Sequence, residues 1–274
     1  AFLAHEVAIG QRIVRAKRTL AEAKVPFEVP SGDALHARIP TTLEVVYLIF
    51  NEGYTATAGD HWIRPALCEE ALRLGRILAQ LAPREAEVHG LLALMELQAS
   101  RLHARVDKAG EPVLLHDQDR RKCDRLMITR GLASLSRAEA LARPLGPYTL
   151  QAALAACHAR APTPKDTDWQ RIVALYDALV QMTGSPVVEL NRAVAVSMAF
   201  GPEEGLALIE ELAEEPALRD YHLLPAARGD LLLKLGRRPE AKEQFERAAA
   251  LTNNAREKAL LTARAAECGN DAPN

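Results

Sequence analysis

Apolar residues recur at intervals of three and four along most of this chain, and over no window of strand length do they alternate with polar residues. The first pattern places apolar side chains on one face of an α-helix, whereas alternation is typical of a half-buried strand. The sequence therefore predicts an all-α protein. Of its 274 residues, 49% are hydrophobic but 4% are aromatic, so we expect a core built mainly from Ala, Leu and Val.

A repeat in the last third of the sequence indicates how the helices are arranged. The stretch LGRRPEA, residues 235–241, ends one helix at a glycine and starts the next at once. Gly229 precedes Ala241, and Phe245 and Ala248 follow it, at the offsets of the small and large residues of tetratricopeptide (TPR) repeats. Two weaker copies comprise Ala193, Gly205, Ile209 and Leu212, and Ala71, Gly75, Leu78 and Pro83. The copies predict TPR-like stacked helical hairpins, with a simple up-down bundle as the alternative.

The composition divides the chain into three parts. Residues 1–24 are a first segment with a basic helix over residues 6–24, and the proline-rich residues 25–40 are expected to be a linker with at most one short turn. Residues 41–274 are expected to form an all-helical extension, whose first helix is capped by Thr41 or Thr42. A later helix is expected from about Gln118 to Leu141, and Asp168 can cap the helix that follows it. The chain does not begin with Met, so it looks like a fragment of a longer protein.

Charge and residue usage exclude several classes of protein. A formal net charge of −2 excludes a uniformly basic nucleic-acid binder but leaves room for a local basic element. We find no apolar run of about 18 residues to span a membrane and no signal peptide. The cysteines are far apart and include no Cys-x-x-Cys pair, which indicates reduced thiols in a cytoplasmic protein and no metal site. They are Cys68, Cys123, Cys157 and Cys268.

No motif for catalysis is visible in the sequence. A glycine-rich phosphate loop, a Gly-x-Ser-x-Gly turn and a His-Glu-x-x-His pair are all missing. We therefore expect no enzyme activity and no cofactor.

The strongly basic element is GQRIVRAKRTL, residues 10–20. At about 100° per residue, one side of this helix is apolar and the other basic. The apolar side consists of Ile9, Ile13, Ala16 and Leu20, and the basic side of Gln11, Arg12, Arg15 and Arg18. Arg and Gln are the side chains that clamp phosphates or read guanine and adenine edges. The helix therefore either binds nucleic acid or has an ordinary solvated basic face.

Two clusters of polar residues inside apolar helices are candidate interaction sites. The first could be a docking site, or a helix C-cap with Gly53 in the left-handed conformation. The second could line a peptide groove, or form a salt-bridge network between hairpins. Their members are Asn51, Glu52 and Tyr54 in the first cluster and Glu189, Asn191 and Arg192 in the second.

Several segments together resemble a known family. The start of the chain, FLAHEVAIGQRIVRAKR (residues 2–18), resembles the end of the second helix-turn-helix of an extracytoplasmic-function (ECF) RNA polymerase sigma factor. Downstream segments resemble, in order along nearly the whole chain, the subgroup of these factors with a long TPR-like extension. They are LIFNEGY (48–54), CEEALRL (68–74), GLLALM (90–95), DQDR (117–120), GPY (146–148), AACHA (155–159), TDW (167–169) and VELNRAVA (188–195).

The resemblance assigns a role to the basic helix. It implies that residues 6–24 are the remnant of a helix-turn-helix that reads the −35 promoter element in the major groove. Base or phosphate contacts are then expected from Gln11, Arg12 and Arg15, and phosphate contacts from Lys17 and Arg18. Region 2 and the first helix of the helix-turn-helix are not in the sequence, so we expect this fragment by itself to bind promoter DNA poorly.

The resemblance also implies partners for the intact protein. These are promoter DNA and core RNA polymerase, with residues 41–274 as a regulatory module that docks on the sigma regions or on polymerase. The alternative is a TPR-like adaptor that binds a peptide or small ligand and has no role on DNA.

Overall fold

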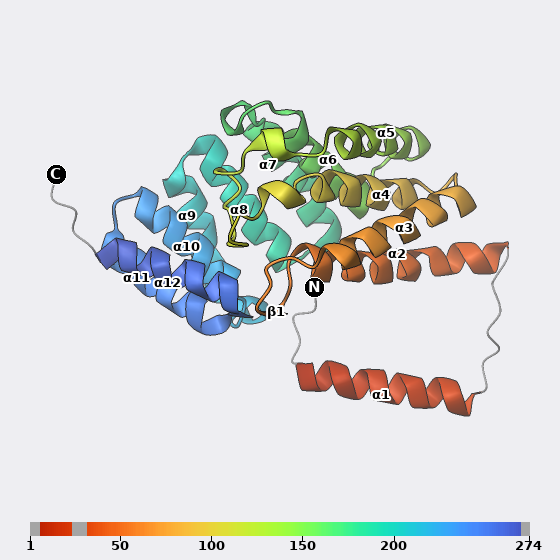
Figure 1. Ribbon diagram of the computed structural model, residues 1–274, viewed down its shortest axis with the longest axis horizontal. Coiled ribbons are helices and arrows are strands. Elements are labelled where there is room, and N and C mark those ends of the chain that lie inside the picture. Colours follow the sequence, from red (N-terminus) through yellow and green to blue (C-terminus); the bar gives the residue numbers. More distant parts are fainter. Residues whose placement is uncertain (1–5, 24–31, 270–274) are drawn as a thin grey trace.

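The computed structural model describes residues 6–23 and 32–269, and the predicted all-α class is confirmed (Figure 1). The twelve α-helices described are α1 (Glu6–Glu22), α2 (Asp33–Tyr54), α3 (Pro65–Leu81), α4 (Ala86–Ala99), α5 (Arg125–Leu141), α6 (Pro147–Arg160), α7 (Trp169–Thr183), α8 (Pro186–Phe200), α9 (Pro202–Glu211), α10 (Leu223–Lys234), α11 (Arg238–Leu251) and α12 (Ala255–Gly269). Four 3-10 helices are η1 (Leu102–Ala104), η2 (Arg120–Lys122), η3 (Pro164–Asp166) and η4 (Pro216–Leu218), and the strands β1 (Ala58–Gly59) and β2 (Asn253–Asn254) pair in parallel. Within these ranges, every helix is too short or too polar to cross a lipid bilayer.

From α2 onward, each helix packs against the next one in the chain, so that the helices follow one another along a curved array (Figure 1). The apolar core is correspondingly a series of clusters rather than one centre. Phe50 and Met95 belong to the cluster of α2–α4, Ile172 to that of α6–α8, and Phe245 to that of α8–α12. Such a chain of neighbouring interfaces is the organisation of a helical solenoid.

Small residues at the repeat positions allow the paired helices to approach closely. A Cβ atom added at Gly229 would lie 2.9 Å from the ring of Phe245, which is fully buried. A Cβ at Gly205 would lie 2.4 Å from that of Ser197, and one at Gly75 would lie 2.6 Å from the Met95 methyl group. The predicted pairing of a small with a large residue is thus confirmed for Gly229 and Phe245, whereas the nearest contacts of Gly205 and Gly75 are with residues outside the predicted copies.

Helix α2 corrects the predicted linker. Residues 33–40 are helical, and α2 continues through Pro40 without a break. The reason is the burial of Ile39, which is 7% exposed and packs in the same cluster as Leu43. Its transfer from water favours the helix by roughly 2 kcal/mol, while Pro40 is exposed, so that the helix carbonyl it leaves unbonded can bind water.

The predicted cap of this helix is consequently wrong. Thr41 and Thr42 lie inside α2 and not at its start. The hydroxyl of Thr42 donates a hydrogen bond of 2.9 Å to the carbonyl of Arg38, one turn back. This is how a threonine inside a helix satisfies its hydroxyl, in place of capping.

The connection between α4 and α5 is longer than the sequence pattern predicts. We expected a helix from about Gln118, but α5 begins at Arg125. Asp124 sets this start, because its carboxylate accepts hydrogen bonds from the backbone N–H groups of Leu126 (2.8 Å) and Met127 (3.0 Å). Residues 100–124 therefore form a folded connection that contains η1 and η2.

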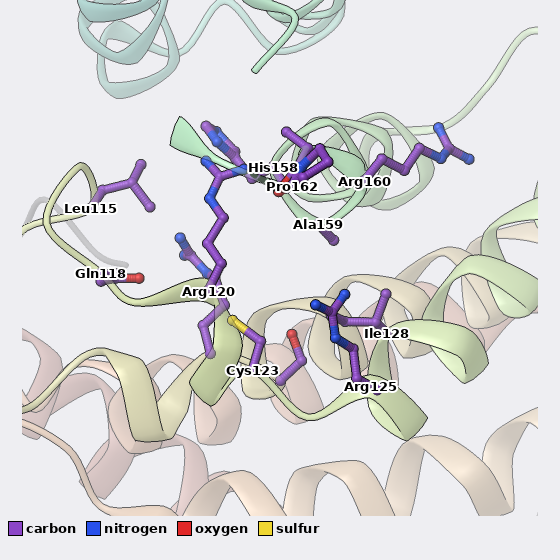
Figure 2. A pocket seen from close by; sticks show the side chains of 13 residues that line it. Leu115, Gln118, Arg120, Cys123, Arg125, Ile128, His158, Ala159, Arg160 and Pro162 are labelled. Atoms are coloured by element: carbon purple, nitrogen blue, oxygen red, sulfur yellow. Dashed lines mark hydrogen bonds between the residues drawn. The ribbon is translucent and has the colours of Figure 1, made fainter. Parts of the chain in front are cut away.

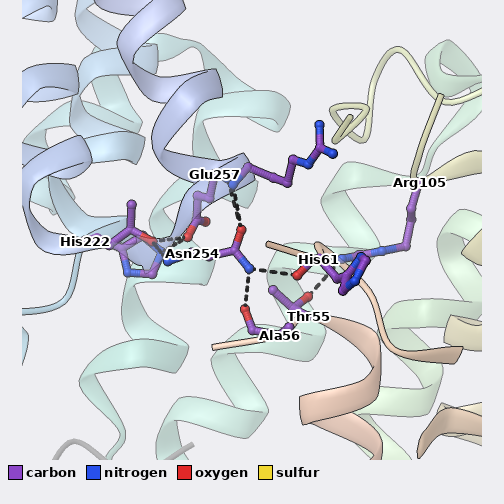
Figure 3. Close-up of polar contacts among 9 residues, drawn as sticks. Thr55, Ala56, His61, Arg105, His222, Asn254 and Glu257 are labelled. Carbon is purple, nitrogen blue, oxygen red and sulfur yellow. Dashed lines mark hydrogen bonds and ion pairs between the residues drawn. The ribbon is translucent and has the colours of Figure 1, made fainter. Parts of the chain in front are cut away.

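The two ends of the array meet through Asn254, a contact between residues nearly 200 positions apart (Figure 3). Its side-chain amide donates to the carbonyls of Ala56 and His61, both at 3.0 Å. Its amide oxygen accepts from the backbone N–H groups of Arg256 (3.1 Å) and Glu257 (3.2 Å), at the start of α12. Together with the β1–β2 pair, Asn254 fastens the loop after α2 to the last helix.

Candidate functional site

The predicted DNA-binding helix α1 presents its basic residues to solvent. The side chains of Gln11, Arg15, Lys17 and Arg18 are exposed. Arg18 lies 2.7 Å from Glu22 on the same helix, an exposed pair of the kind that contributes little stability. Arg12, the remaining predicted contact, lies outside the described side chains. The four described side chains are thus accessible to a ligand, with Arg18 also paired to Glu22.

The predicted apolar side of α1 is also uncovered. Ile13 is 51% exposed and Leu20 is 58% exposed, and Ala16 between them is exposed as well. Figure 1 shows α1 apart from α2–α12. Within the described ranges, the extension therefore does not bury the apolar stripe that the sequence predicts.

At the end of α2, Glu52 and Gly53 have structural roles. Glu52 accepts a hydrogen bond of 2.9 Å from the hydroxyl of Thr57 and lies 3.1 Å from Arg64, so it holds the following loop. The predicted left-handed cap at Gly53 is wrong, because α2 continues to Tyr54 and Gly53 is helical. Glycine is needed here for another reason: a Cβ would lie 2.7 Å from the backbone nitrogen of Cys68.

Tyr54 connects α2 to two arginines. Its ring stacks on that of Phe50. The guanidinium carbon of Arg105 lies over the Tyr54 ring, 3.7 Å from the ring centroid, in a cation–π contact. Its hydroxyl accepts a hydrogen bond of 2.6 Å from Nη2 of Arg101. The same nitrogen donates to Oε1 of Gln98 at 2.8 Å. Tyr54 and Gln98 therefore fix the orientation of the Arg101 guanidinium.

Arg101 lines a cavity of about 300 Å³ between the α4–α5 connection and the end of α6 (Figure 2). Its lining contains four arginines and, among the described residues, no acidic side chain. Leucine, isoleucine, alanine and proline side chains add apolar surface to the wall. The lining residues are Ser100, Arg101, Leu115, Gln118, Arg120, Cys123, Arg125, Ile128, His158, Ala159, Arg160, Ala161 and Pro162.

Arg120 holds two walls of this cavity together. Its Nη1 donates to the backbone carbonyls of His158 (3.0 Å) and Ala161 (2.6 Å), and its Nη2 donates to the hydroxyl of Thr167 at 2.9 Å. Figure 2 shows the side chain of Arg120 extending from η2 toward His158. These acceptors are uncharged, so none of them forms an ion pair with Arg120.

Three polar atoms in the cavity wall are buried and have no hydrogen-bond partner among the described residues. They are Nη1 of Arg101, Nδ1 of His158 and Oε1 of Gln118. Burial and the neighbouring guanidinium groups of Arg101 and Arg120 lower the pKa of His158 to about 4, so its ring is neutral at pH 7. Buried polar atoms normally have partners, and atoms left without one indicate a role beyond stability.

A second cavity of about 310 Å³ adjoins the first and shares Arg101, Leu115 and His158 with it. Asn191 of α8 lines this second cavity. The other two members of its predicted cluster are elsewhere: Arg192 lies 2.6 Å from both Asp177 and Glu189. Glu189 and Arg192 thus belong to a partly exposed ion-pair network that joins α8 to α7, while Asn191 faces a cavity.

Sequence reasoning missed Arg101, Arg120 and His158 as members of one site. Arg120 and His158 lie in segments that carry the family resemblance, DQDR and AACHA, but nothing in their spacing places them together. The one local indication is the polar character of residues 100–124 after an apolar helix.

Comparisons with known proteins give a family match and a relative, neither of assigned function. Residues 38–139, from α2 into α5, match a family of unknown function (DUF6596). The chain is 49% identical over 261 residues to an uncharacterized protein, R00370, of Rhizobium meliloti (strain 1021). The match covers 95% of this chain and 61% of the relative, so the chain spans about three fifths of the length of that relative.

Proposed function

We propose that this chain is part of an ECF-type RNA polymerase sigma factor, in which α1 reads the −35 promoter element and α2–α12 form a regulatory module. The observation that carries the proposal is the exposure of both sides of α1. Gln11, Arg15, Lys17 and Arg18 are free to meet DNA, and guanidinium and amide groups on one helix face suit base edges and phosphates.

The uncovered apolar side of α1 supports the same proposal. A recognition helix needs a partner helix that sets its angle in the major groove. Ile13 and Leu20 would form the contact with that partner. The matched relative is longer than this chain, since 39% of its length (100% − 61%) lies outside the match, which leaves room for the remaining sigma regions.

Run-off transcription with core RNA polymerase tests the proposal. The protein used is the full-length one, carrying Arg12→Ala, Arg15→Ala and Arg18→Ala together. We expect at least a tenfold loss of promoter-dependent transcript, because each lost phosphate or base contact weakens binding. Transcription at the unchanged level would overturn the proposal.

A charge-matched control separates DNA reading from a general effect of charge. Arg84, Lys108 and Arg143 are exposed on the body and take part in no hydrogen bond or ion pair with the described residues. Replacing all three by Ala removes the same charge, and we expect transcription to stay within twofold of the wild type.

An adaptor that binds a small ligand and has no role on DNA is the second candidate function. The observation that favours it is the arginine-lined cavity, which lies far from α1 in the chain and is lined by the α4–α5 connection, the start of α5 and the end of α6. In that case the full-length protein supports no transcription on any promoter in a genomic pool, while ligand binding persists in the triple α1 variant.

A further inference from the structure

We propose that the cavity lined by Arg101, Gln118 and His158 binds a small hydroxy acid, with its carboxylate held by Arg101 and His158 and its hydroxyl by Gln118. The inference does not depend on DNA binding by α1. Within the proposed sigma factor, the bound acid would be the signal that the regulatory module senses.

The carboxylate is assigned from the unused donors. Nη2 of Arg101 donates to Tyr54 and Gln98, whereas Nη1 is a buried donor without a partner among the described residues. Nδ1 of His158 is the second buried nitrogen without a partner among the described residues, and it donates in the tautomer that carries the proton on Nδ1. His158 lines both cavities together with Arg101. Two donor atoms match the two oxygens of a planar carboxylate, and a donor from a charged group forms the stronger bond.

The negative charge of the ligand is inferred from the residues around these donors. Arg101, Arg120, Arg125 and Arg160 line the cavity, and no acidic side chain among the described residues lines it with them. A buried guanidinium without a counter-ion is costly, and an anion would relieve this cost. The same groups would repel an ammonium group, so the ligand is an acid without an amino group.

The hydroxyl is assigned from Gln118. This side chain is 8% exposed, and its Nε2 donates to the carbonyl of Val113 at 3.0 Å, which orients the amide. Its Oε1 is left as a buried acceptor without a partner among the described residues. A hydroxyl of the ligand would supply the missing donor.

The volume and the apolar wall limit the size of the ligand. A cavity of about 300 Å³ lies at the small end of ligand-binding pockets. Figure 2 shows Leu115, Ile128 and Pro162 around the same space as His158 and Arg120. A short aliphatic or single-ring body fits this lining, whereas an extended peptide does not.

Titration calorimetry on the 274-residue chain tests the inference with two hydroxy acids that bracket the size, lactate and mandelate. Propionate and phenylacetate lack the hydroxyl, lactamide and mandelamide lack the charge, and phenyl phosphate replaces the carboxylate. We expect at least one hydroxy acid to bind, at least tenfold more tightly than its amide and at least threefold more tightly than the acid without the hydroxyl. No binding of either acid at 20 mM, or tenfold tighter binding of phenyl phosphate, would overturn the inference.

Matched arginine variants locate the binding. Arg101→Met removes a donor that is buried, whereas Arg125→Met removes an exposed arginine of the same cavity. We expect at least a tenfold loss of affinity for Arg101→Met and less than a threefold loss for Arg125→Met. If thermal unfolding shows that Arg101→Met is not folded, His158→Phe serves as a second variant, because it keeps an aromatic ring but removes the ring nitrogens. Unchanged affinity in a folded Arg101→Met or His158→Phe protein contradicts the assignment.

The calorimetry result can be interpreted independently of the transcription result that tests the sigma-factor proposal. The calorimetry involves neither DNA nor polymerase, so a negative result leaves promoter reading by α1 untouched. Conversely, if the α1 variant transcribes at the unchanged level, the sigma-factor proposal fails but the conclusion on ligand binding is not affected.

Discussion

The hydroxyl of Tyr54 lies 2.6 Å from Nη2 of Arg101, and this hydrogen bond joins the end of α2 to the residues that follow α4. The bond does more than connect two elements. It occupies Nη2, while Nη1 of the same guanidinium is buried and has no hydrogen-bond partner in the described part of the chain. A residue of the predicted Asn51, Glu52 and Tyr54 cluster therefore acts on the cavity indirectly, as a positioning residue.

Tyr54→Phe should weaken hydroxy-acid binding at least threefold, because the guanidinium of Arg101 loses one of the bonds that orient it. The ring remains to stack on Phe50 and Arg105, so we expect the free energy of unfolding to fall by only about 1 kcal/mol. Calorimetry and urea unfolding measure the two effects. Tyr221→Phe, at a hydroxyl without a hydrogen bond to any described residue, is the control, and equal effects of both changes would refute the positioning role.

Asn254→Ala should destabilise the protein strongly. The substitution removes four hydrogen bonds and leaves the buried carbonyl of Ala56 unpaired. At about 1 kcal/mol for each bond, we expect a loss of about 4 kcal/mol in the free energy of unfolding. Urea unfolding measures it, and hydrogen exchange should show faster exchange in residues 55–62. The neighbouring Asn253 is exposed, so Asn253→Ala should change stability by less than about 0.5 kcal/mol.

Gly229→Ala should destabilise the protein although alanine is the better helix former. In an open helix the change would stabilise by about 1 kcal/mol. Here the new Cβ meets the ring of Phe245 at 2.9 Å, and we expect a net loss of about 1–2 kcal/mol in the free energy of unfolding. Gly269→Ala, where the nearest atom would be 3.7 Å away on Lys242, is the control and should be neutral or slightly stabilising.

His158 should make the protein less stable in acid. Its pKa is about 4 in the folded chain and about 6.5 in an unfolded one. Between these values the unfolded state binds more protons, so stability falls as the pH falls from about 6.5 to about 4. At pH 5 the loss from this one group is roughly 2 kcal/mol relative to pH 7.

The measurement is urea unfolding at pH 7 and pH 5 for the wild type and for His158→Phe. The phenyl ring does not titrate, so the variant should lose less stability over this interval than the wild type. The same loss in both proteins would show that other groups account for the acid sensitivity.

Local pattern was enough to predict much of the fold. Helical spacing gave the all-α class, and the Gly229 and Phe245 offsets gave the close packing of α10 on α11, since both depend on residues less than twenty positions apart. Asp168 was expected to cap the helix after it, and its carboxylate accepts from the N–H of Arg171 at 2.9 Å. The basic residues of α1 were likewise visible as a pattern of charge on one helix.

Only the tertiary structure shows those features that depend on contacts between residues far apart in the sequence. Local pattern placed a linker at residues 33–40, but the burial of Ile39 against the body makes them helical. Asn254 meets Ala56 across 198 positions, and Arg101, Gln118 and His158 enclose one cavity only after α4, α6 and their connections have packed. The sequence by itself determined which face of each helix is apolar, because that follows from local periodicity. Which polar groups come together, and which are left without a partner, is set by the packing of elements far apart in the chain.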